Sequence, residues 1–140
     1  MGPSIFIGID PGKHTGLAVW DSRAEKFLCV ESHLIHKAID RVREIHQAEG
    51  DNLFVIFEDS RQRKWFGYGN TKKKLKGAGS VNRDSTIWED FLKDEKIAFR
   101  AVPPRAGMTG KSPEYMKEIS GWDKRTSDHS RDAMMLVYGK

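Results

Sequence analysis

The sequence contains a single cysteine, Cys29, in 140 residues, so no disulfide can form within the chain. One thiol is typical of a protein kept in a reducing cytoplasm, where Cys29 is expected to be a small buried residue. No apolar run approaches the roughly 20 residues needed to cross a membrane. The apolar stretch at residues 5–9 is too short for a signal peptide and leads directly into Asp-Pro-Gly. We therefore expect a cytoplasmic protein with no membrane partner.

Positive charge is concentrated in one segment, residues 60–77, which contains seven Lys and Arg residues and no acid. The net charge of the whole chain is +4, so the remaining residues together carry −3. A lysine run is often only a solvated loop, but here aromatic rings are interleaved with the charges. Arginine and lysine neutralise phosphates, and flat rings stack on bases, so this pattern favours a loop that binds nucleic acid. Its candidate contact residues are Arg61, Arg63, Lys64, Trp65, Phe66, Tyr68, Lys72, Lys73, Lys74 and Lys76.

The periodicity of apolar residues predicts an α/β fold in one domain, residues 1–140, because no segment has the composition of a linker. Short polar turns join the first three strands into an antiparallel meander, and the later strands are expected to add in parallel. The run L-F-V-I-F at residues 53–57 is apolar on both faces and predicts a central, buried strand. The expected strands are residues 5–10, 16–21, 26–33, 53–57 and 97–102, and the expected helices are residues 34–47, 81–93, 113–119 and 128–137.

Acidic residues occur where three of these elements begin or end. Asp10 ends the first strand before a Pro-Gly turn, and Glu58 directly follows the central strand. The last helix begins D-H-S-R-D, where Asp128, His129 and Asp132 share one helix face. If the first and fourth strands are neighbours, Asp10 and Glu58 lie side by side, and the last helix needs only to place its first turn against them.

Carboxylates gathered in this way repel one another and persist together only around a cation. Oxygen ligands with few imidazoles favour Mg²⁺ or Mn²⁺ over Zn²⁺, and two such ions can clamp the attacking and leaving oxygens of a phosphodiester. The simpler alternative is that these are ordinary acids at strand ends and a helix start. The neighbouring cationic, aromatic segment favours the metal site, with Asp10, Glu58, Asp128, His129 and Asp132 as candidate ligands.

The sequence resembles the RuvC family of Holliday junction resolvases, within the ribonuclease H-like superfamily. The shared motifs are G-I-D-P-G at residues 8–12 followed by Thr15-Gly16, the strand V-I-F-E ending at Glu58, and H-S-R-D-A at residues 129–133. The resemblance implies a five-stranded mixed sheet, order 3-2-1-4-5, flanked by helices. It also implies Asp10, Glu58, His129 and Asp132 as catalytic residues around two divalent ions, with Asp128 as an alternative ligand and Lys111 near DNA phosphates.

The family acts on four-way DNA junctions as dimers, so the resemblance implies a homodimeric, Mg²⁺-dependent endonuclease of branched DNA. The family has a phenylalanine three residues after the glutamate, whereas this chain has Arg61 there, with Trp65 and Phe66 as the nearest aromatics. Two alternatives stay open: a nuclease of the same fold acting on RNA or other DNA structures, and a non-catalytic nucleic-acid-binding module. A compact version such as this is of the kind a bacteriophage encodes, and it would then act in the host-cell cytoplasm.

Overall fold

The computed structural model describes residues 2–62 and 72–140, and for residues 72–78 it describes the main chain only. Five strands and four helices alternate along these parts of the chain, with two short 3-10 turns, η1 (Gly50–Asn52) and η2 (Ser60–Gln62). The elements are β1 (Ile5–Asp10), β2 (His14–Asp21), β3 (Lys26–Leu34), α1 (Ile35–Glu49), β4 (Leu53–Glu58), α2 (Lys72–Asp94), β5 (Phe99–Val102), α3 (Pro113–Ser120) and α4 (Asp128–Val137).

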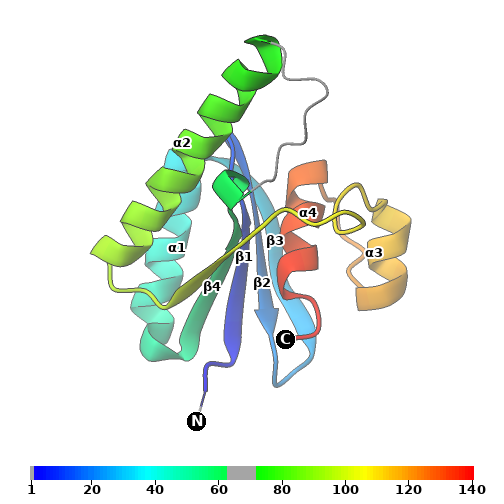
Figure 1. Cartoon of the computed structure of the whole chain (residues 1–140). Coiled ribbons are helices and arrows are strands. Elements are labelled where there is room, and N and C mark those ends of the chain that lie inside the picture. Colours follow the sequence, from blue (N-terminus) through cyan, green and yellow to red (C-terminus); the bar gives the residue numbers. More distant parts are fainter. Residues whose placement is uncertain (1, 63–71) are drawn as a thin grey trace.

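The strands form one mixed sheet in the order β3-β2-β1-β4-β5, which confirms the predicted topology. Strands β1, β2 and β3 pair antiparallel as a meander. Strand β4 adds parallel to β1, and β5 adds parallel to β4. The carboxyl ends of β1, β4 and β5 therefore meet at one edge of the sheet, which lies at the top in Figure 1.

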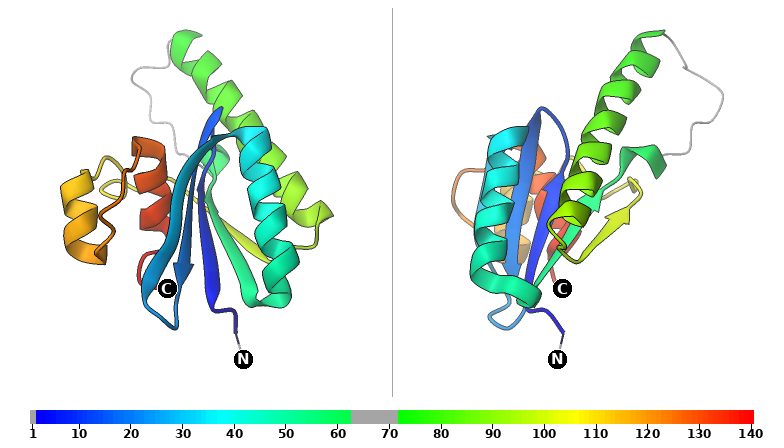
Figure 2. Two further views of the ribbon diagram at one scale, coloured as in Figure 1. Left: turned by 180° about the vertical axis from the view of Figure 1, so that it is seen from behind. Right: turned by 90° about the vertical axis from the view of Figure 1, so that its left-hand side faces the viewer.

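Helices cover both faces of the sheet, α1 and α2 on one and α4 and α3 on the other (Figures 1 and 2). Alternation along each strand decides which side chain enters which layer. Ile5, Ile7 and Ile9 of β1 pack in the core beneath α1 and α2. Ala18 and Trp20 of β2 pack in the second core, beneath α4. Residues Gly8 and Asp10 of β1 therefore lie on the α4 side.

The main difference from the sequence prediction is the length of α2, which begins at Lys72 and not near residue 81. Two glycines, Gly77 and Gly79, made this stretch resemble a loop, since each costs about 1 kcal/mol in a helix interior. The lysines of the predicted loop, Lys72, Lys73, Lys74 and Lys76, are thus the first turns of a helix. This half of α2 extends beyond the sheet edge at which β1 and β4 end (Figure 1).

Smaller differences are that β2 begins earlier, at His14, and β5 later, at Phe99. Cys29 is only partly buried and accepts a 3.8 Å hydrogen bond from Arg41. Burial, followed by the charge of Glu31, raises the pKa of its thiol to about 11, so it stays protonated. None of the helices described here is long and apolar enough to cross a membrane.

Candidate active site

Asp10 and Glu58 end adjacent parallel strands. The last paired positions of β1 and β4 are Ile9 and Phe57, so the two acids are the next residues along, side by side. Ile9 and Phe57 both point into the core beneath α1 and α2. Because strand side chains alternate, Asp10 and Glu58 both project to the opposite face, the one that carries α4.

Two glycines let α4 lie directly on the backbone of this face. A Cβ atom on Gly8 would overlap the carbonyl oxygen of Ala133, and one on Gly16 would overlap that of His129. Gly16 is also the β2 partner of Asp10 in the sheet. These glycines therefore set how close the first turns of α4 come to Asp10. They belong to the G-I-D-P-G and Thr15-Gly16 motifs, but the sequence alone did not reveal this packing role.

The start of α4 is fixed by a capping box. The Ser127 hydroxyl accepts a hydrogen bond from the backbone N–H of Ser130, and the Ser130 hydroxyl accepts one from the N–H of Ser127. The buried Arg131 side chain donates from Nε to the Lys111 carbonyl oxygen at 2.7 Å and from Nη1 to Thr126 Oγ1 at 2.9 Å. The first turn of α4 is thereby held at both its backbone and its side chains.

This anchoring brings His129 and Asp132 to Asp10, as the sequence predicted. The His129 ring contacts Asp10, with Nδ1 at 2.9 Å from Oδ2. Burial raises the pKa of Asp10 to about 6, against the lowering effect of His129, and the charge of Asp132 raises it further. Burial also raises the pKa of Asp132, although Gly110 donates its backbone N–H to that carboxylate at 3.2 Å. After burial, the charge of Asp132, from a distant part of the chain, thus contributes to the raised pKa of Asp10.

Asp128 has a different environment from Asp132. Its carboxylate pairs with Arg131, and its side chain is 88% exposed. The charge of Asp132 acts on Asp10, whereas Asp128 pairs with the arginine that anchors the helix. Asp128 was expected as an alternative or additional ligand, and its pairing with Arg131 makes it a poorer candidate than Asp132.

The donors at this site match the preferences of a hard divalent cation, because a cation would relieve the mutual repulsion of Asp10 and Asp132. As the side chains stand, no three His, Cys, Asp or Glu residues within the described ranges are placed to hold one ion together. Glu58 is partly exposed and lines a hollow that continues along β4 and β5. A complete ligand set would therefore require side chains to turn toward the ion.

The turn after Glu58 is tied to α2 by an ionic cluster. Arg61 donates to both oxygens of the buried Asp59, at 2.8 and 3.0 Å, and to Glu89 of α2 at 3.0 Å. Burial opposes ionisation of Asp59, but the hydrogen bonds from Arg61 and Gln62 outweigh it and lower the pKa. Arg61 was predicted to bind phosphate, yet here it bridges two carboxylates of its own chain. Sequence reasoning missed Asp59 and Glu89, since their role depends on how α2 packs.

The other residues predicted to contact nucleic acid fall into three groups, according to how much of each the structure describes. Lys111 lies near the start of α3, with its ammonium 4.9 Å from the Tyr115 ring centre. Four lysines form the first turns of α2, where the main chain alone is described: Lys72, Lys73, Lys74 and Lys76. Five predicted contacts lie outside the described residues: Arg63, Lys64, Trp65, Phe66 and Tyr68.

No protein-family model matches the sequence, and no curated protein matches it either. Solved structures do match in fold. RuvC of T. thermophilus, in complex with a Holliday junction substrate, matches with a TM-score of 0.62 at 17% identity, over 96% of this chain and 91% of that one. The fowlpox virus Holliday junction resolvase matches with a TM-score of 0.50 at 15% identity, over 94% of each chain.

The chain therefore has the ribonuclease H-like fold, and the predicted resemblance to RuvC resolvases is confirmed at the level of the fold. At identities this low the likeness establishes the architecture and not the reaction. What the protein does has to be argued from Asp10, Glu58, His129 and Asp132.

Proposed function

We propose that this protein is a divalent-metal-dependent, structure-selective endonuclease that cuts branched DNA, with four-way junctions as its preferred substrate. One observation carries the proposal. Asp10 and Glu58 end neighbouring strands on the same face, α4 places His129 against Asp10, and the charge of Asp132 acts on Asp10. The structural neighbours support it, since the T. thermophilus and fowlpox proteins are Holliday junction resolvases and each has been solved with junction DNA.

In this proposal Asp10, Glu58 and Asp132 hold the ions, Mg²⁺ or Mn²⁺, with His129 as a further ligand or proton carrier. Bound metal would supply an activated water and stabilise the leaving oxygen of the phosphodiester. Asp10 orients the His129 ring through Nδ1, which leaves Nε2 to accept or donate a proton. The lysines at the start of α2 lie on the same edge of the sheet and would hold the DNA backbone.

The proposal is tested by incubating a labelled mobile four-way junction with the protein and Mg²⁺, Mn²⁺ or Ca²⁺, and mapping the cuts. We expect Mg²⁺ and Mn²⁺ to give paired nicks near the branch, and the D10N variant to bind the junction without cutting it. Flap, duplex and RNA–DNA hybrid substrates, compared at equal concentration, establish the selectivity. Cleavage by D10N at the wild-type rate would remove Asp10 from the mechanism.

A second candidate is a non-catalytic module that binds nucleic acid with the same fold. It is favoured by the finding that no three metal-ligating side chains of the described chain are arranged around a common point. Junction binding without nicking in any metal by the wild-type protein would establish this alternative. The homodimer implied by the family resemblance stays a prediction, which sedimentation of the protein with and without junction DNA decides.

A further inference from the structure

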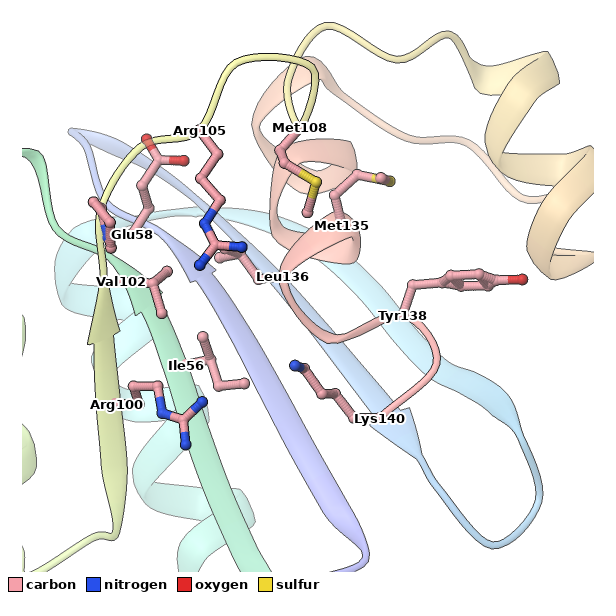
Figure 3. A pocket seen from close by; sticks show the side chains of 11 residues that line it. Ile56, Glu58, Arg100, Val102, Arg105, Met108, Met135, Leu136, Tyr138 and Lys140 are labelled. Atoms are coloured by element: carbon pink, nitrogen blue, oxygen red, sulfur yellow. The ribbon is translucent and has the colours of Figure 1, made fainter. Parts of the chain in front are cut away.

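A hollow of about 220 Å³ opens beside Glu58 and runs along β4 and β5 (Figure 3). It lies between the end of α4 and the segment after β5, because α4 packs mainly across β1 and β2 of the same sheet face. Glu58 lines its upper end in Figure 3. A second hollow shares Glu58, Pro103 and Arg105 with it, so the depression continues past the candidate active site.

Positive charge surrounds this hollow. Arg100 of β5, Arg105 and Lys140 line it, and Glu58 is its one acidic residue. Figure 3 shows the charged ends of Arg105 and Lys140 reaching into the space from opposite sides. Within residues 2–62 and 72–140, no ion pair joins Arg100, Arg105 or Lys140 to a carboxylate. In this respect the three cations differ from Arg61, which is paired with two carboxylates.

Lys140 is held in this position by its backbone. Its carbonyl oxygen accepts a 3.1 Å hydrogen bond from the Trp20 indole, and its N–H donates to the Val137 carbonyl oxygen at 3.2 Å. Trp20 belongs to the core beneath α4. These two hydrogen bonds hold the Lys140 main chain against the body of the protein.

The floor of the hollow is apolar and adaptable. Ile56 of β4, Met135 of α4 and Met108 contribute to it. Thioethers adjust to flat aromatic partners and make favourable sulfur–ring contacts. An apolar floor rimmed by cations suits a ligand that has both a flat ring and a phosphate.

The volume of the hollow limits such a ligand to one ring and the phosphates next to it. A volume of about 220 Å³ lies below the roughly 300–1,000 Å³ of sites for drug-sized molecules. A DNA duplex, whose major groove alone is about 12 Å wide, cannot enter it. Because Glu58 belongs both to the hollow and to the candidate active site, a ligand in the hollow would lie next to the metal and substrate bound by that site.

We propose that this hollow, termed the Glu58 cleft, binds one unpaired nucleotide of the strand being cut, with its phosphates on Arg100, Arg105 and Lys140 and its base on the methionine floor. The inference rests on the proposed function and narrows it, because it requires the nucleotide next to the cut to leave the duplex. An endonuclease built in this way would favour branch points, where a nucleotide unpairs at low cost. Selectivity for branched DNA would then come partly from the Glu58 cleft.

The test compares R100E/K140E with the control R23E/K37E, which makes the same charge change at exposed positions in the β2–β3 turn and on α1. Dissociation constants for a labelled four-way junction are measured in Ca²⁺ at several salt concentrations. Losing two phosphate contacts should weaken binding about tenfold near 0.15 M salt and flatten the log–log salt slope by about 1.4. The control should match the wild type.

Photo-cross-linking locates the nucleotide. 5-Iododeoxyuridine is placed at each position flanking the mapped cut in turn, and cross-linked peptides are identified by mass spectrometry. We expect a cross-link to Met135 or Tyr138 from one position only, and its loss in R100E/K140E. If the wild type cuts the junction while R100E/K140E keeps its affinity and slope and no cross-link reaches the cleft, the inference is wrong and the proposed function stands. If the wild type cuts no substrate, the proposed function fails; 5-iododeoxyuridine is then placed at the branch point itself, and its cross-links and the binding data decide whether the Glu58 cleft holds a nucleotide.

Discussion

Replacing Gly16 with alanine tests the close contact between sheet and helix that assembles the candidate site. The new Cβ would overlap the carbonyl oxygen of His129, a backbone atom that no side-chain rotation can move. The first turn of α4 must therefore shift, by on the order of 1 Å. Displacements of that size at a catalytic site cost about 100-fold in rate, and overpacking of this kind costs about 1–3 kcal/mol of stability.

The assay is junction cleavage with Mg²⁺ together with thermal unfolding. We expect G16A to cut about 100-fold more slowly while its melting temperature falls by about 5–10 °C. The matched control is G79A on α2, where a Cβ meets nothing within 4 Å and improves helix propensity. That variant should cut normally and unfold at the same or a slightly higher temperature. Wild-type cleavage and stability in G16A would refute the direct packing of α4 on the backbone of β2 at Gly16.

The remaining predictions concern single charges. Asp10 has a pKa of about 6 in the folded protein against 3.8 unfolded, so metal-free protein should lose up to about 3 kcal/mol of stability as pH rises from about 4 to 7. D10N should lack this decline, and urea unfolding of both proteins across that range measures the difference. The free energy of unfolding of R61A, measured with urea, should be about 2–3 kcal/mol lower than that of the wild type, because the variant leaves Asp59 buried without its cation. Equal free energies would contradict a stabilising role for Arg61. D128N should keep cleavage within about threefold of wild type, whereas D132N should lose it more than 100-fold, and the reverse ranking would assign the metal to Asp128.

Much of the architecture follows from local patterns in the sequence. The apolar run ending at Glu58 predicted a central strand, and β4 does lie between β1 and β5. Likewise the last helix was expected at residues 128–137, and α4 spans Asp128–Val137. The placement of Asp10 beside Glu58 followed once the two strands were taken as neighbours. These features depend on residues close in sequence or on the pairing of whole strands.

Features that depend on packing between distant residues were not predictable. Arg61 looked like a free cation because one of its two carboxylate partners, Glu89, lies in α2, which only the fold brings near it. The early start of α2 was hidden by Gly77 and Gly79, whose cost the helix absorbs. The packing role of Gly16 was invisible because nothing local to it indicates the helix that lies on it, 113 residues later at His129.

The proposed function requires Asp10, Glu58 and Asp132 to hold divalent metal jointly. Calorimetric titration of the DNA-free protein with Mn²⁺ measures this binding without any substrate. We expect saturable binding by the wild type and by D128N, and its loss in D10N, E58Q and D132N when all five proteins give the same circular dichroism spectrum. Equal Mn²⁺ binding by the wild type, D10N and D132N would show that these carboxylates do not hold the metal.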